Sequence, residues 1–193
     1  GFVPGGIALA SINYTLAPEA DMDRIVRECR AAVAWCYRHA AELGVDPDRI
    51  HVSGHSAGGH LTAMAMATDW PALDPALPAD LVKSGCPISG LYDLEPIRLT
   101  YVNDDVQLND GHIARNSPAT LRPHGPRSMV IAAGGLESDE FHRQQDVLVE
   151  RWRPYLDEVE VVDMPGRHHF DVVTAFAEPE NPLCVAARRR ITG

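Results

Sequence analysis

The chain has 193 residues, of which 45% are hydrophobic and 23% are charged. These values are ordinary for one globular domain with a sizeable core. The formal net charge of −10 argues against nucleic acid or an anionic membrane as the main partner. No apolar run reaches membrane-spanning length, and the first residues lack the pattern of a signal peptide.

The four cysteines form no CxxC pair, and Cys29 and Cys36 fall in an apolar helical pattern typical of small core residues. We therefore expect a cytoplasmic, reduced protein. We expect a small-molecule substrate and no cofactor. A homodimer is compatible with the sequence, which does not fix the oligomeric state.

The first half of the chain predicts alternating strands and helices. Residues 7–13 (IALASIN) form a short apolar run typical of a strand buried on both faces. A helix is predicted over 22–43, with Asp21 as its N-cap and Gly44 at its end. The next elements are a strand at 49–53, a helix at 57–68 and a strand at 82–89.

The second half continues the alternation after an irregular stretch over 90–125. The predicted strands are 129–133 and 159–163, and the predicted helices are 110–114, 140–156, 172–176 and 181–192. Alternating strands and helices indicate a mostly parallel sheet covered by helices on both faces. We expect one domain over 1–193, with 91–125 as a cap or substrate loop.

Residues 54–58 match the pattern G-x-S-x-G between a predicted strand and a predicted helix. This pattern places a serine on a sharp turn at the carboxyl edge of a sheet, with glycines where larger side chains would collide. Ser56 is therefore the candidate nucleophile, and the Ala57 backbone N–H is the candidate oxyanion donor. The alternative is that Ser56 only caps the helix.

A nucleophilic serine needs a base, and the base needs an acid that orients it. In this fold the acid follows the next-to-last strand and the histidine follows the last strand. The candidate acids are Glu137, Asp139 and Glu140; we favour Glu137, with Asp139 as the alternative acid or as a helix cap. For the base we favour His169 over His168, and we expect Asp171 to cap the last helix.

Three further histidines, His51, His55 and His60, raise the possibility of a metal site. His55 and His60 are five residues apart, so they do not share a helix face, and no HExxH or CxxC motif accompanies them. We therefore predict no metal. His55 and Tyr92 are candidates for substrate contact, although a buried structural tyrosine is an equally good interpretation of Tyr92.

Several segments together resemble the kynurenine formamidase (arylformamidase) and esterase branch of the α/β-hydrolases. They are NYTLAPEAD, GHSAGGHL, SGLYDLEPI, NSPAT, GLESDEFHRQ and RHHFDVV, spread over about residues 7 to 176. The resemblance implies an α/β-hydrolase fold with Ser56 as nucleophile, Glu137 as acid and His169 as base. Relatives usually have aspartate at the acid position, so glutamate is a departure that keeps Asp139 open.

The expected His-Gly-Gly motif, which supplies further oxyanion donors in the family, is absent. Pro4-Gly5-Gly6 does not match it, because it precedes the first predicted strand and has no histidine. We therefore expect an N-terminally incomplete domain that lacks the first strands of the family. Loss of one oxyanion donor costs on the order of 3 kcal/mol of transition-state stabilisation, so we expect weak activity from these 193 residues alone.

Three functions are compatible with these residues. The first is arylformamidase-type hydrolysis of N-formyl aryl amines such as N-formylkynurenine. The second is a carboxylesterase acting on small acyl or aryl esters, which would use the same residues. The third is a non-catalytic binding protein on the same fold, which would have no need of a complete Ser56, His169 and Glu137 set.

Overall fold

The computed structural model describes all 193 residues. Its centre is a four-stranded sheet in the order β1-β2-β3-β4, and all three strand pairs are parallel. The strands are β1 (Ile50–His55), β2 (Val82–Ile88), β3 (Ser128–Ile131) and β4 (Glu158–Val161). Because the strands are parallel, all of their carboxyl ends lie at one edge of the sheet, where the loops that follow them can meet.

Helices connect these strands. They are α1 (Met22–Arg38), α2 (Ala40–Leu43), α3 (Ala57–Met66), α4 (Trp70–Leu73), α5 (Glu95–Arg98), α6 (Asn103–Val106), α7 (Asp110–Asn116), α8 (Asp139–Trp152) and α9 (Pro182–Thr192). Short 3-10 helices span Val3–Gly5, Pro47–Arg49, Pro118–Thr120, Arg153–Tyr155 and Val172–Ala177.

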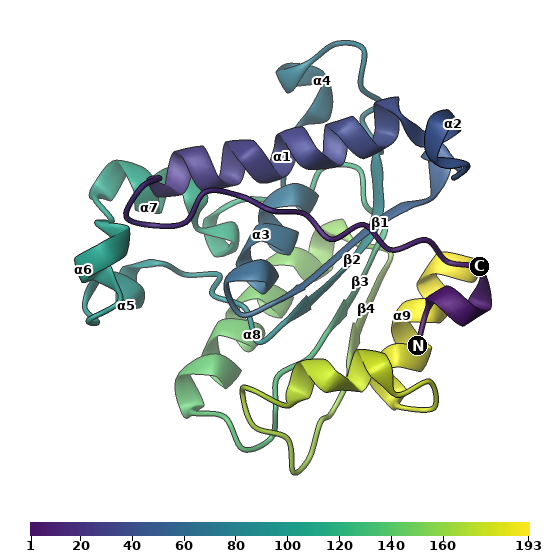
Figure 1. The fold of residues 1–193 in the computed structure, drawn as a ribbon. Coiled ribbons are helices and arrows are strands. Elements are labelled where there is room, and N and C mark those ends of the chain that lie inside the picture. Colours follow the sequence, from purple (N-terminus) through teal and green to yellow (C-terminus); the bar gives the residue numbers. More distant parts are fainter.

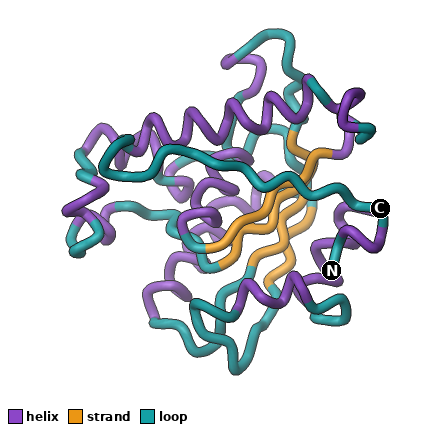
Figure 2. The backbone as a smooth tube through the Cα atoms, in the orientation of Figure 1, coloured by secondary structure: helices purple, strands orange, loops and turns teal.

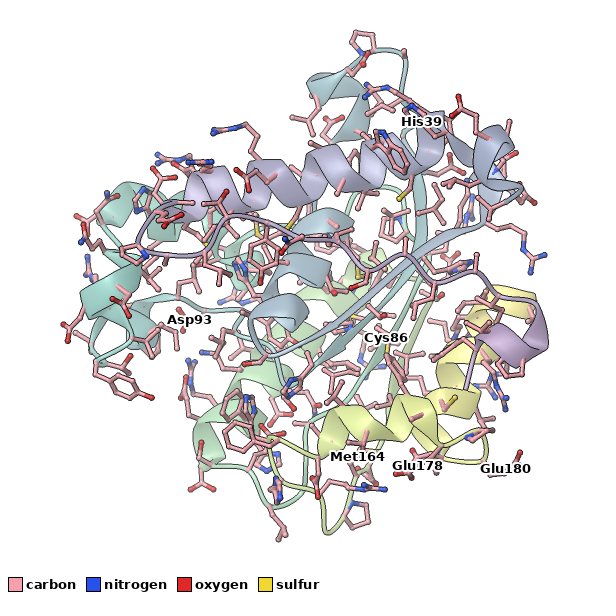
Figure 3. The ribbon with its side chains drawn as sticks, in the orientation of Figure 1. His39, Cys86, Asp93, Met164, Glu178 and Glu180 are labelled. Atoms are coloured by element: carbon pink, nitrogen blue, oxygen red, sulfur yellow. The ribbon has the colours of Figure 1, made fainter.

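The sheet is covered on both faces, as the alternation predicts. Met129 and Ile131 of β3 belong to a core cluster with residues of α1, α3 and α8. Val130, between them in sequence, belongs to a second cluster with residues of Val172–Ala177 and α9. Figure 1 shows α1 lying across α3, while α9 lies apart from both. Cys86 and Met164, labelled in Figure 3, are members of the second cluster.

The long N-terminal helix is shorter than predicted. Its N-cap is confirmed, because the Asp21 carboxylate accepts a hydrogen bond from the Arg24 N–H at 2.8 Å. The helix is interrupted at His39, and α2 then ends at Gly44, which has the left-handed φ of 67° that favours glycine. The predicted single helix over 22–43 is therefore two helices with one break.

Residues 7–13 do not form the strand that their apolar sequence predicts. They cross the molecule as an extended loop (Figure 2), and residues 8–13 are exposed. A cavity of about 480 Å³, lined in part by Ile7, Leu9, Val52 and Ser53, lies between this segment and β1. A strand needs a neighbour for its backbone N–H and C=O groups, and residues 7–13 are not paired with any strand of the sheet.

The stretch between β2 and β3 contains α5, α6 and α7, with the expected helix at 110–114 present as α7. The end of α7 is joined to α1 through Asp23. The Asp23 carboxylate pairs with Arg115 and accepts a hydrogen bond from the Asn116 amide at 2.7 Å. A role for 91–125 as a cap or substrate loop stays a prediction. None of the helices combines the length and the apolar character needed to cross a bilayer.

Candidate active site

Ser56 lies at the turn between β1 and α3 and has a left-handed backbone, with φ 58° and ψ −117°. Such a conformation costs a non-glycine residue on the order of 1 to 3 kcal/mol and is concentrated at functional sites. Ser56 occupies the N-cap position of α3, yet its side chain makes no capping hydrogen bond. The structure therefore does not support the interpretation of Ser56 as a helix cap.

Gly54 of the motif and Gly59, which directly follows the motif, are required by close backbone contacts, whereas a Cβ on the motif's Gly58 would meet nothing within 4 Å. A Cβ on Gly54 would lie 2.3 Å from the Gly58 carbonyl oxygen, and a Cβ on Gly59 would lie 2.8 Å from the Gly90 Cα. Either methyl group would push α3 away from the sheet. These contacts explain why glycines occupy these positions around Ser56.

The structure brings together the three side chains that the sequence analysis favours. The Ser56 hydroxyl lies 3.0 Å from His169 Nε2, and His169 Nδ1 lies 3.0 Å from Glu137 Oε2. Ser56 follows β1, Glu137 follows β3 and His169 follows β4, so the three residues meet at the carboxyl edge of the sheet although 113 positions separate the serine from the histidine. With Nδ1–H donating to the carboxylate, Nε2 is free to accept the serine proton.

The other two candidate acids point elsewhere. Asp139 is exposed at the first position of α8, and Ser138 rather than Asp139 occupies the N-cap position of that helix. Glu140 pairs with Arg143 and accepts a hydrogen bond from the Gln144 amide at 2.8 Å. The Arg143 guanidinium lowers the pKa of Glu140 below its usual value. Glu137 is the carboxylate that faces His169.

The Glu137 side chain has no exposed surface. Its Oε1 accepts hydrogen bonds from the Ser89 hydroxyl at 2.5 Å and from the Gly134 N–H at 2.7 Å. These donors replace the hydrogen bonds to water that a carboxylate loses when it is buried. Neither donor is predicted from the sequence. The available signal was the position of Ser89 at the end of a predicted strand, on the edge where the other site residues were expected.

The His169 ring packs against other aromatic rings. His55 and Phe141 each have a ring centroid 4.5 Å from that of His169, and the exposed Phe170 ring lies 5.4 Å away. The His55 Nε2 atom is buried without a hydrogen-bond partner. Burial, and then the neighbouring His169, lower the pKa of His55. Substrate contact by His55 stays a prediction, whereas its packing against His169 is a feature of the structure.

His168 is not part of the hydrogen-bonded set formed by Ser56, His169 and Glu137. Its backbone N–H donates to the Asp171 carboxylate at 2.7 Å, and its side chain is 56% exposed. Asp171 does stand at the N-cap position of the following 3-10 helix, although its side chain makes no capping bond there.

The other histidines contact separate partners. His51 Nδ1 lies 2.7 Å from the Ser84 hydroxyl, and the buried His60 Nε2 lies 2.7 Å from the Asn116 carbonyl. Nowhere do three or more His, Cys, Asp or Glu side chains form a group that could hold a metal ion.

Tyr92 does not line the site, so the prediction of substrate contact is wrong for this residue. Its side chain is 1% exposed, and its hydroxyl accepts a hydrogen bond from the Gly90 N–H at 3.2 Å. Burial raises the pKa of Tyr92 above its usual value. The structure supports the alternative interpretation of Tyr92 as a buried structural residue.

Ala57 is the first residue of α3 and is exposed. The first N–H groups of a helix have no partner inside the helix, so this backbone N–H is free to donate to an oxyanion. Its part in oxyanion binding stays a prediction.

Comparison with known proteins identifies several that are similar to this chain. The family described as BD-FAE matches residues 1–83. Kynurenine formamidase from Danio rerio is 28% identical over 99% of this chain, and that from Salmo salar is 30% identical over 92% of it. The chain spans 64% and 60% of the length of these two relatives. Esterase LipC from Mycobacterium tuberculosis is 31% identical over 87% of this chain and 46% of its own length.

Solved structures share the fold. A candidate thioesterase from a Silicibacter species superposes with a TM-score of 0.81 at 29% identity, covering 99% of this chain and 66% of that one. EstE1, a thermostable carboxylesterase cloned from a metagenomic library, superposes with a TM-score of 0.73 at 21% identity, covering 95% of this chain and 69% of that one.

Proposed function

We propose that this chain, which has an α/β-hydrolase fold and resembles formamidases and esterases, carries the catalytic centre of a serine hydrolase. The observation that supports this most directly is the hydrogen-bonded row from Ser56 through His169 to Glu137. The proposed roles are nucleophile for Ser56, general base for His169 and orienting acid for Glu137. The Ala57 backbone N–H supplies one oxyanion donor.

The proposed reaction is hydrolysis of an N-formyl aryl amine, the chemistry named in its kynurenine formamidase relatives. Ser56 Oγ attacks the formyl carbonyl while its proton passes to His169 Nε2. The tetrahedral intermediate then collapses, the C–N bond breaks, and His169 returns the proton to the leaving amine. Water, deprotonated by the same imidazole, attacks the formyl-serine and releases formate.

Glu137 holds His169 in the tautomer that this cycle needs. A buried carboxylate that accepts a hydrogen bond from Nδ1–H leaves Nε2 as the acceptor facing Ser56, and it stabilises the imidazolium formed when the serine gives up its proton. The packing of His55 and Phe141 on the ring restricts its rotation. Both effects keep the base within reach of the serine before the substrate arrives.

A carboxylesterase is the second candidate, because esterases are also among the relatives. The same residues would cleave a C–O bond and release an alcohol in place of an amine. The shape of the site around Ser56 and the reactivity of the leaving group would then decide which substrate turns over.

The two activities are separated by assaying the full-length protein on N-formylkynurenine and on p-nitrophenyl acetate side by side. The inactive variant is Ser56→Ala. The matched control is Ser53→Ala, which removes an exposed serine hydroxyl from β1, the strand that precedes Ser56. We expect formate release that depends on Ser56 and exceeds ester cleavage. Fast ester cleavage without formate release would indicate a carboxylesterase, and no turnover of either would favour the non-catalytic binding protein.

A further inference from the structure

Ser89 is a second serine with an unusual backbone close to the site. It directly follows β2, is 2% exposed and has a left-handed φ of 46°. Its backbone N–H donates to the Ala132 carbonyl at 2.8 Å, so the conformation is fixed by the neighbouring strand segment. Glycine adopts this conformation more easily than serine. A serine kept in a strained, buried position calls for a use of its side chain.

That side chain contacts the acid of the proposed triad. The Ser89 hydroxyl lies 2.5 Å from Glu137 Oε1, and an ionised carboxylate only accepts hydrogen bonds, so the hydroxyl is the donor. The Gly134 N–H donates to the same oxygen at 2.7 Å, which leaves Oε2 facing His169. Two donors on one oxygen fix the direction of the carboxylate plane as well as its position.

We propose that Ser89 is a positioning residue that fixes the Glu137 carboxylate and, through it, the orientation of His169. This inference rests on the proposed function and adds a fourth member to its hydrogen-bonded row. Ser89 contacts neither His169 nor Ser56 by a hydrogen bond, so it acts through Glu137 alone. It should therefore affect the reactivity of Ser56 and leave ligand binding unchanged.

Ser89→Gly is the informative substitution, because it removes the hydroxyl and also relieves the strained backbone. The matched control is Ser117→Ala, which removes another buried hydroxyl, one that accepts from the Leu94 N–H at 3.2 Å and has no contact with Glu137. Circular dichroism and thermal unfolding of the full-length variants confirm that both are folded.

The readout is the kinetics of covalent labelling of Ser56 by a fluorophosphonate probe. A hydrogen bond to a charged group is worth enough to change a rate by about 10- to 100-fold. We expect Ser89→Gly to lower the maximal labelling rate by that factor without changing the half-saturating probe concentration, and Ser117→Ala to label at the wild-type rate. In a Glu137→Ala background, Ser89→Gly should cause no further decrease, since its only partner in the row is gone.

Two results would overturn the inference: wild-type labelling kinetics in Ser89→Gly, or an equal further decrease in the Glu137→Ala background. Failure of the proposed function looks different, because the wild-type protein would then not be labelled at Ser56. In that case the ¹H NMR signal of the His169 Nδ1 proton decides. Loss of that signal through faster exchange in Ser89→Gly, but not in Ser117→Ala, supports the positioning role, and an unchanged signal contradicts it.

Discussion

The two oxygens of the Glu137 carboxylate have separate tasks. Oε2 accepts a hydrogen bond from His169 Nδ1–H, while Oε1 is held by Ser89 and the Gly134 backbone. These two donors fix the end of the glutamate side chain. The acid is therefore defined by its contacts rather than by its residue type.

Glu137→Gln tests that assignment. The amide can present an N–H where the carboxylate accepts a hydrogen bond, which would stabilise the wrong imidazole tautomer. We expect a decrease in kcat on the order of 10⁴-fold. The matched control is Asp139→Asn, which neutralises an exposed acid two positions away and should leave kcat unchanged. A large effect of Asp139→Asn with little effect of Glu137→Gln would reverse the assignment.

At the residue scale, the sequence could predict Ser56, Glu137 and His169 because each follows a predicted strand in a fixed order. Contacts made by tertiary packing could not be predicted from the sequence. Ser89 and Phe141 come from different parts of the chain, and nothing in their local sequence indicates which side chains they touch. Tyr92 shows the opposite failure, since an aromatic residue near the site proves to be buried in the core.

The connection of β1 to α3 is the element on which the geometry of the site depends. Gly59 lets the first turn of α3 approach the backbone that follows β2, where a Cβ would lie 2.8 Å from both the Gly90 Cα and the Ile88 carbonyl oxygen. Gly58, its neighbour in the same turn, has nothing within 4 Å of the corresponding position. One glycine of the pair is thus required by packing and the other is not.

Gly59→Ala and Gly58→Ala form a matched pair that tests this difference. We expect Gly59→Ala to lower the free energy of unfolding by about 2 kcal/mol or more, because a backbone contact has to move. Gly58→Ala should leave stability unchanged or raise it by up to about 1 kcal/mol, the helix preference of alanine over glycine. Urea denaturation measures both. Equal effects would show that α3 does not make this close contact.

Helices and strands could be predicted where local sequence patterns determine them. The four paired strands, the cap at Asp21 and the end at Gly44 follow from local patterns. Residues 7–13 have the composition of a buried strand but remain unpaired, because pairing requires a neighbouring strand that composition cannot supply. The break at His39 was likewise invisible in the apolar periodicity.

On the scale of the whole molecule, buried histidines make stability depend on pH. Burial lowers the pKa of His60 to about 4, and burial together with Arg49 and Lys83 lowers that of His51 to about 4. In the unfolded chain both would titrate near their ordinary value of about 6.5. Between these values acid protonates the unfolded chain and not the folded one, so stability is full above about pH 6.5 and falls as the pH approaches 4.

We expect His51 and His60 each to reduce the free energy of unfolding by roughly 2 kcal/mol between pH 7 and pH 5. His60→Gln and His51→Asn should each remove that part of the pH dependence, measured by urea denaturation at both pH values. The control is His168→Gln, which replaces a side chain that is 56% exposed. An unchanged pH dependence in both buried-histidine variants would contradict the account.

The central claim is that Ser56 is an activated nucleophile, and the most direct test identifies the residue that a fluorophosphonate modifies. The full-length protein would be labelled, digested and analysed by peptide mass spectrometry, with His169→Ala as the variant that lacks the base. The account predicts one adduct, on the peptide that contains Ser56, and a labelling rate that collapses in His169→Ala. An adduct on another serine, or labelling of Ser56 at the same rate without His169, would contradict it.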